Sequence, residues 1–184
     1  MNQHYFQPDP QIDGWMNPLE LQWLYEQAQR MQSIVEVGSW KGRSTHALLS
    51  GCKGLVYAVD HFRGSESQIE TVHKEAKTAD IYAQFIQNVG HFKNLYVLKK
   101  ESIEASTLFS PHSIDMVFID GDHEREAFQA DLEAWGPIAK VLLCGHDRDE
   151  EGVPLVLRES GLAIQDGEVS IWYVEKWQMP EVRR

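Results

Sequence analysis

The sequence is short of cysteine, of basic residues and of long apolar runs, and each shortage excludes a class of protein. Only Cys52 and Cys144 occur among the 184 residues. Two cysteines are too few for a disulfide scaffold or a structural zinc site, so we expect both to be reduced core residues. Lys and Arg number 17 against 28 Asp and Glu, which gives a net charge of −11. Such a field repels phosphate backbones and anionic lipids, and it disfavours nucleic acids and membranes as partners.

The sequence also lacks the segments that carry a chain into or across a membrane. No apolar run approaches the roughly eighteen residues that a membrane span needs, and the first residues have neither the basic nor the apolar part of a signal peptide. We therefore expect a cytoplasmic protein. At roughly 150 residues per domain, the length predicts one domain. We expect an N-terminal arm at 1–16, the domain at 17–177 and a tail at 178–184.

Short apolar runs alternate with helical stretches along the chain. Asn17, Pro18 and Glu20 predict the start of a first helix, because an Asn cap followed three residues later by Glu forms a capping box. Runs rich in branched residues predict five strands, at 33–37, 55–60, 95–98, 114–120 and 140–144. Helices are expected at 43–49, around 68–89, near 104–109, at 123–139 and at 152–161.

This alternation predicts an α/β fold, a single-domain, Rossmann-like, doubly wound sheet that is mainly parallel. Asp166 and Gly167 form a two-residue hairpin signal between 162–165 and 169–175, so the sheet should end in an antiparallel C-terminal hairpin strand. Ligands of such sheets bind at the carboxyl ends of the strands, where functional residues are to be sought.

The pattern of apolar residues also predicts which side chains of one helix and of the last strand face the core. On the helix at 123–139, the apolar face should hold Phe128, Leu132 and Trp135, with Asp131 and Glu133 off that face. Aromatic residues near the end of the chain should pack in the core or at the sheet edge; these are Trp172, Tyr173 and Trp177.

The first strand runs into a glycine-containing loop between Glu36 and Ser44. Gly38 and Gly42 let the chain turn tightly beneath a ligand and enter a helix whose free amides attract anions. A dinucleotide site needs a glycine where Trp40 stands, because the pyrophosphate must approach the backbone there. The loop therefore suits a smaller ligand without a pyrophosphate, although the glycines could also serve an ordinary strand-to-helix turn.

This loop resembles the first motif of the class I S-adenosylmethionine-dependent methyltransferases, which reads Glu-x-Gly-x-x-x-Gly-x-Ser in the small O-methyltransferase branch. The resemblance covers about residues 30–177. It implies S-adenosylmethionine as cofactor, with Asp60 on the ribose, about 20 positions beyond Gly38, and Ser102 near the adenine. The cofactor-binding residues that it implies are Glu36, Gly38, Ser39, Trp40, Gly42, Ser44, Asp60, His61, Ser102 and Asp120.

Acids and histidines gather at the ends of the fourth and fifth strands, in 120–123 and 145–147. Three carboxylates and two imidazoles on adjacent strand ends repel or desolvate one another unless a cation joins them or a reaction uses their shifted pKa values. A divalent metal would meet this need. Oxygen ligands favour magnesium, whereas a histidine ligand favours manganese, zinc or iron.

The same segments resemble a methyltransferase subgroup with Ile-Asp-Gly-Asp-His and Gly-His-Asp motifs and, more distantly, the metal-dependent catechol and sugar O-methyltransferases. The resemblance implies Asp120, His146 and Asp147 as metal ligands. His146 departs from the usual Asp of that pair, so a metal-free variant stays open. The catalytic base that the resemblance implies is Asp122 or His123, and we favour His123 for its pKa near 6.5. A plain helix start, with Asp122 as the N-cap, is the structural alternative for both.

These features favour methyl transfer to a hydroxyl of a small-molecule acceptor. Two alternatives remain: a metal-dependent glycosyltransferase that uses Asp120-Gly-Asp122 as an Asp-x-Asp pattern, and a cofactor-binding module without catalysis. The acceptor pocket should be small or exposed, or completed by a second copy of the chain in a homodimer. Four histidines in polar stretches are expected at the surface: His61, His73, His91 and His112.

Overall fold

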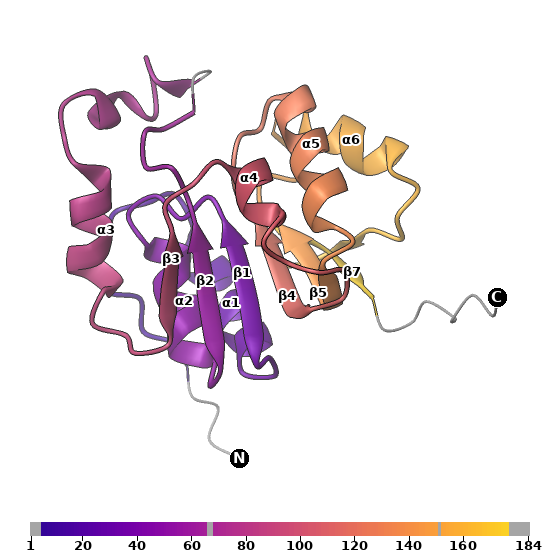
Figure 1. The fold of residues 1–184 in the computed structure, drawn as a ribbon, viewed down its shortest axis with the longest axis horizontal. Coiled ribbons are helices and arrows are strands. Elements are labelled where there is room, and N and C mark those ends of the chain that lie inside the picture. The colour runs from indigo at the N-terminus through magenta and orange to yellow at the C-terminus, as the bar shows by residue number, and fades with distance from the viewer. Residues whose placement is uncertain (1–4, 66–67, 151, 177–184) are drawn as a thin grey trace.

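The computed structural model describes residues 5–65, 68–150 and 152–176. In these residues one seven-stranded sheet has the order β3-β2-β1-β4-β5-β7-β6, and helices cover both of its faces (Figure 1). The strands are β1 Ser33–Val37, β2 Leu55–Val59, β3 Leu95–Leu98, β4 Ile114–Ile119, β5 Ala139–Gly145, β6 Gln165–Asp166 and β7 Trp172–Glu175. The α-helices are α1 Pro18–Ala28, α2 Arg43–Gly51, α3 Ile81–Val89, α4 Ser102–Ser106, α5 Arg125–Trp135 and α6 Val153–Glu159, and a short 3₁₀ helix, η2, spans Lys74–Lys77.

The sheet is parallel from β3 to β5, and β7 runs antiparallel between β5 and β6. The predicted fold class is therefore confirmed. The chain reverses its direction of travel across the sheet between β1 and β4, which lie side by side. In doubly wound sheets this switch point opens the crevice that receives a ligand.

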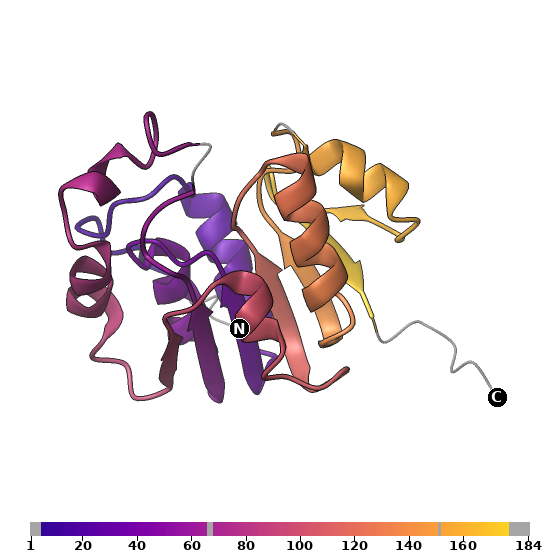
Figure 2. The ribbon, with the colours of Figure 1, turned by 45° about the horizontal axis from the view of Figure 1, so that its top comes forward.

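Two apolar clusters hold the helices to the two faces of the sheet. Strand side chains alternate between faces, so Met116 and Phe118 join the cluster under α1, α2 and α3, whereas Val117 and Ile119 join the one under α5 and α6. Figure 2 shows α5 and α6 in front of the sheet and α1 and α2 behind it, as in Figure 1. Cys52 and Cys144 are buried free thiols, as expected.

Helix α1 begins with the predicted capping box. The Asn17 side chain accepts hydrogen bonds from the backbone amides of Leu19 and Glu20, and Glu20 Oε2 accepts one from the Asn17 amide at 2.9 Å. The arm before it lies over the domain. Two hydrogen bonds at 2.8 Å fix this arm, from the Arg43 guanidinium to the carbonyl oxygens of Ile12 and Met16.

The C-terminal hairpin exists, but its predicted turn is wrong. Asp166 lies inside β6, opposite Trp172, and the connection spans residues 167–171. The Gly167 amide closes this loop with a 2.9 Å hydrogen bond to the Ile171 carbonyl, and the Asp166 carboxylate pairs with Arg148. The connection therefore begins after Asp166 rather than at it.

The region around 68–89 is helical only in part. Asp80 caps α3 by accepting a hydrogen bond from the Ala83 amide at 2.9 Å, and before it the described residues have only 3₁₀ structure, at Gln68 and in η2. Trp172 is buried and Tyr173 packs against the core, as predicted. Trp177 and the tail at 178–184 lie outside the described residues. In the part of the chain described, no helix is both long enough and apolar enough to cross a bilayer.

Candidate active site

The carboxyl ends of the five parallel strands open into one cavity of about 900 Å³. The cavity brings together most of the site residues that the sequence predicts: Gly38, Ser39, Trp40, Ser44, Asp60, His61, Ser102, Asp120, Asp122, His123, His146 and Asp147. Glu36 and Gly42 do not line it. Residues 13–16 of the arm form part of its wall, so the N-terminal arm contributes to the site.

The glycines of the first loop are required by its geometry. Gly38 has φ +85°, and a Cβ built there would stand 2.0 Å from the carbonyl oxygen of Asp120. Gly42 has φ +91° and faces the side chains of Phe85 and Val89. Both positions therefore need glycine, because L side chains rarely adopt such φ values. The loop from β1 consequently passes directly against the end of β4.

Asp60 fixes the same loop from the neighbouring strand. Its Oδ2 accepts hydrogen bonds from the amides of Ser39 at 2.9 Å and Trp40 at 2.8 Å, and its Oδ1 accepts one from Phe62. Oδ2 already accepts two hydrogen bonds, but Oδ1 has a second lone pair, so Asp60 can still accept a hydrogen bond from a ligand hydroxyl. The sequence predicted only that Asp60 binds a ligand, and the structure adds that Asp60 also holds the loop.

Glu36 lies beneath the loop rather than in the cavity. Its side chain is fully buried, and Oε2 accepts a hydrogen bond from the Thr45 hydroxyl. Oε1 has no hydrogen-bond partner, and neither does the buried hydroxyl of Ser39. Burial raises the pKa of Glu36 to about 7. The group is therefore a destabilised carboxylate under the loop.

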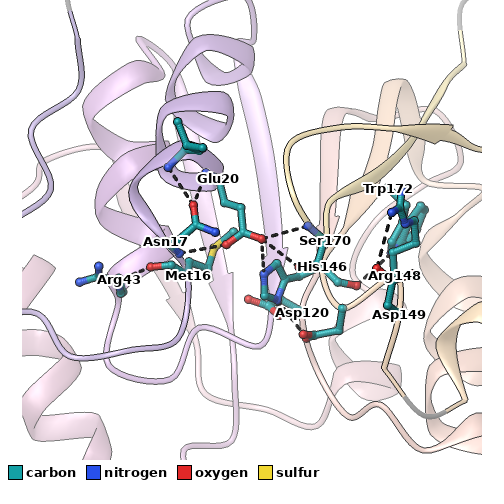
Figure 3. Close-up of polar contacts among 12 residues, drawn as sticks. Met16, Asn17, Glu20, Arg43, Asp120, His146, Arg148, Asp149, Ser170 and Trp172 are labelled. Atoms are coloured by element: carbon teal, nitrogen blue, oxygen red, sulfur yellow. Dashed lines mark hydrogen bonds and ion pairs between the residues drawn. The ribbon is translucent and has the colours of Figure 1, made fainter.

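His146 joins the acids at the other end of the cavity (Figure 3). Its Nδ1 lies 3.0 Å from Asp147 Oδ2 and 3.5 Å from Asp120 Oδ1, and its Nε2 lies 3.0 Å from Glu20 Oε1. Burial alone would lower the pKa of His146, but the charge of Asp120, with hydrogen bonds to Asp120, Asp147 and Glu20, raises it to about 12.

His123 reaches the cluster through Asp147. The two side chains meet at 2.7 Å between His123 Nε2 and Asp147 Oδ2, and Gln68 Nε2 lies 3.3 Å from His123 Nδ1. Although burial opposes it, the bond to Asp147 raises the pKa of His123. The two imidazoles overcome the burial of Asp147 and hold its pKa well below the usual range. Asp122 is not the helix N-cap, because α5 follows Glu124.

The segment that contains the glycine loop and the two acidic strand ends matches a known family. A family model described as a methyltransferase domain matches residues 35–147, more than half of the chain. This chain belongs to that methyltransferase family. The matched segment runs from β1 to the end of β5 and so contains both halves of the cavity.

Solved structures share the fold of this methyltransferase at low sequence identity. An O-methyltransferase from Bacillus cereus in complex with SAH has a TM-score of 0.59 and 18% identity, over 91% of this chain and 84% of that chain. A TDP-rhamnose 3'-O-methyltransferase of calicheamicin biosynthesis gives 0.57 and 16%, over 88% and 78%. An SAH-bound methyltransferase from Podospora anserina gives 0.59 and 13%, over 88% and 80%. These likenesses establish the fold.

The methyltransferase has a ligand set that fits a divalent metal. Asp120, His146 and Asp147 each offer one ligand atom, and these atoms all lie within 4.8 Å of one another. The two carboxylates suit magnesium or manganese, and the imidazole of His146 shifts the preference from magnesium toward manganese, zinc or iron. The pKa of His146 is raised to about 12, so its ring also places positive charge beside these acids. The His146 imidazolium is thus a second source of the neutralising charge for which the sequence suggested a metal.

Asp131 is a cavity residue that sequence reasoning placed wrongly. It was expected off the apolar face of α5, but it is only 6% exposed and lines the cavity. Its Oδ1 accepts a hydrogen bond from the Ser102 hydroxyl, which in turn accepts one from Trp135 Nε1 at 2.8 Å. Burial raises the pKa of Asp131 to about 6. The helical spacing of Asp131 to Phe128 and Trp135, three and four residues away, was the signal for burial.

His73 also departs from its expected surface position. Its ring lies 4.6 Å from the ring of Trp40 and 5.4 Å from that of Trp15, between centroids, and its Nδ1 accepts a hydrogen bond from the Ser65 amide at 3.1 Å. These three rings form an aromatic wall of the cavity. His61 lines the cavity too, while His91 and His112 are exposed as expected.

Proposed function

We propose that this protein transfers the methyl group of S-adenosylmethionine to a hydroxyl oxygen of a small-molecule acceptor. One observation carries the proposal: a single cavity holds the loop from Gly38 to Ser44 at one end and the pair of His123 and Asp147 at the other. A donor-binding loop and a group able to take a proton are the two parts that such a transfer needs.

The cofactor would occupy the half of the cavity built on β1 and β2. The first turn of α2, which begins at Arg43, offers backbone amides to a carboxylate, and Asp60 Oδ1 has a lone pair for a ribose hydroxyl. The remaining cofactor contacts are proposed for Ser39, Trp40, Ser44, His61, Ser102 and Asp120, which line the cavity. Glu36 and Gly42 would act from beneath, by shaping the loop.

The acceptor would lie between this cofactor and the acid–imidazole cluster. As its oxygen attacks the methyl carbon, the bond from carbon to the sulfonium sulfur breaks and the hydroxyl proton passes to a base. We assign the base to His123, whose Nε2 is held by Asp147 while Nδ1 can accept a proton. Asp122 is the alternative base, and it lines the same part of the cavity.

A divalent metal, held by Asp120, His146 and Asp147, would orient the acceptor hydroxyl and lower its pKa. The loop and Asp60 lie at the other end of the cavity and need no metal. Chelation is therefore expected to stop turnover and to leave cofactor binding in place. Full turnover in excess chelator would remove the metal from the proposal and leave the His146 imidazolium to neutralise the acids.

The test is calorimetry together with a turnover assay. S-adenosylmethionine and S-adenosylhomocysteine should bind at one site, and a sugar nucleotide should not. Methyl transfer from radiolabelled cofactor is then screened against a panel of small alcohols, phenols and sugars. Binding of the sugar nucleotide alone would favour the glycosyltransferase alternative, and cofactor binding without transfer to any acceptor would favour the non-catalytic module.

A further inference from the structure

We propose that Glu20 is a positioning residue of the active site, which holds the His146 ring so that Nδ1 faces Asp120 and Asp147. Glu20 belongs to α1, outside the segment that the family model matches, and nothing in its sequence context points beyond a helix cap. The inference rests on the proposed function only for what the oriented ring does there.

The carboxylate of Glu20 is built into the interior as a junction of four donors (Figure 3). Its side chain belongs to a residue only 2% exposed. Oε2 accepts the Asn17 amide at 2.9 Å, and Oε1 accepts the amide of Ser170 at 3.2 Å and the Ser170 hydroxyl at 2.9 Å. The fourth contact is His146 Nε2 at 3.0 Å.

These contacts fix which ring nitrogen of His146 carries a proton. Although burial opposes it, the contacts with His146, Asn17 and Ser170 lower the pKa of Glu20, and an ionised carboxylate only accepts hydrogen bonds. The amides of Asn17 and Ser170, which can only donate, already point at its oxygens. His146 Nε2 must therefore donate to Oε1. The opposite nitrogen, Nδ1, is left to face the two aspartates at 3.0 and 3.5 Å.

An oriented ring serves the cluster in either of its two states. With a lone pair on Nδ1, His146 can bind a metal beside Asp120 and Asp147, and a carboxylate behind the ring is the usual partner of such a ligand. With a proton on Nδ1, the ring holds the two aspartates together by hydrogen bonds. A ring free to flip would do neither, because its carbon atoms would then face the acids.

A helix cap alone would not require this geometry. A capping-box Glu has only to reach the amide of its own N-cap residue, which Oε2 does without Oε1. Two other residues separate the roles of Glu20: Asn17 shares the cap and Ser170 shares Oε1, and in the described part of the chain neither side chain hydrogen-bonds to His146. Asn17→Ala and Ser170→Ala are thus matched controls for Glu20→Gln.

The first measurement is nitrogen-15 and proton NMR of the His146 ring, assigned by comparison with His146→Asn. The wild type should show an Nε2-bound proton far downfield and slow to exchange with solvent. In Glu20→Gln this signal should move upfield and exchange faster, since a neutral acceptor replaces the carboxylate. The two controls should keep it. An unchanged signal in Glu20→Gln, or an equal change in Asn17→Ala, would overturn the proposal.

The second measurement is the binding of Mn²⁺ and of S-adenosylhomocysteine to the same variants. Glu20→Gln should weaken Mn²⁺ binding about 10- to 100-fold and leave S-adenosylhomocysteine affinity unchanged, whereas Asn17→Ala should affect neither in the folded protein. Equal Mn²⁺ affinity in the wild type and Glu20→Gln would contradict the positioning role. If the wild type itself binds no Mn²⁺, the metal in the proposed function fails, and the ring signal still decides for or against Glu20.

Discussion

The two ends of the cavity are built in different ways. At the cofactor end, backbone holds backbone: Gly38 passes against the Asp120 carbonyl, and Asp60 gathers the amides of the loop. At the acceptor end, side chains hold side chains, with His146 linking Glu20 to Asp120 and Asp147. The first end is one short loop, residues 38–44, which Asp60 holds from 20 and 21 positions away and which meets the Asp120 carbonyl from further along the chain. The second depends on pairs separated by up to 126 positions, so only the folded chain reveals it.

If backbone packing governs the cofactor end, Gly38→Ala should have the largest effect on stability among substitutions in this loop. Its Cβ would stand 2.0 Å from the Asp120 carbonyl oxygen, and relieving that clash must separate β1 from β4. We expect a loss of about 4 kcal/mol or more in the free energy of unfolding, measured by urea denaturation. Gly161→Ala is the control, since Gly161 also has positive φ but no atom within 4 Å. A similar small loss in both variants would contradict the packing account.

Glu36 gives the cofactor end a pH-dependent stability. Its pKa rises to about 7 in the folded protein because of burial, so the native state holds a proton that the unfolded state has released. Stability should therefore be greatest below about pH 4.5 as far as this group is concerned, and fall as the pH rises to about 7, by about 3 kcal/mol in total. Glu36→Gln should abolish that fall. The measurement is urea denaturation between pH 5 and pH 8, and parallel pH profiles in both proteins would refute it.

At the acceptor end, His123→Ala should lower turnover without loss of cofactor affinity. Loss of the base costs roughly a hundredfold or more in kcat, whereas S-adenosylhomocysteine is proposed to contact the glycine loop and Asp60. Asp122→Ala is the comparison, since both residues are candidates for the base. Kinetics with the acceptor found in the panel and calorimetry with S-adenosylhomocysteine would decide. A hundredfold loss in Asp122→Ala alone would move the base to Asp122.

Asp60→Ala should weaken cofactor binding, in contrast to changes at the acceptor end. It removes the acceptor of the Ser39 and Trp40 amides as well as a proposed partner of the ribose. We expect S-adenosylhomocysteine to bind more weakly by about 1–3 kcal/mol in calorimetry. Asp122→Ala, which removes a carboxylate from the acceptor end, should leave that affinity unchanged. Undiminished binding by Asp60→Ala would take Asp60 out of the cofactor site.

The same contrast explains what the sequence could predict. Strands such as Ser33–Val37 and the capping box of α1 are local patterns, and the structure confirms them. The loop glycines were recognisable for the same reason. Asp166 was misplaced because the local Asp-Gly pattern does not show that Asp166 lies opposite Trp172 in the sheet, and the helix around 68–89 was overextended because a wall of the cavity replaces its first part.

At the acceptor end, the sequence could predict which residues take part but not how they contact one another. The sequence placed Asp120, Asp122, His123, His146 and Asp147 at adjacent strand ends, and the structure brings them to one cavity. It could not show that His123 binds Asp147 or that Glu20 lies behind His146, because these contacts depend on side-chain directions after packing. Asp131 was missed because an acid was assumed to face solvent. Its neighbour Ser102 instead gives it a buried hydrogen bond.

The central claim is that one cavity holds the cofactor at the glycine loop and the acceptor at the acid–imidazole cluster. A crystal structure of the complex with S-adenosylhomocysteine tests it most directly. The account predicts the amino-acid part of the ligand against residues 38–44, its ribose within hydrogen-bond distance of Asp60, and its sulfur facing His123 and Asp147. A ligand bound outside this cavity, or one whose sulfur points away from the cluster, would contradict it.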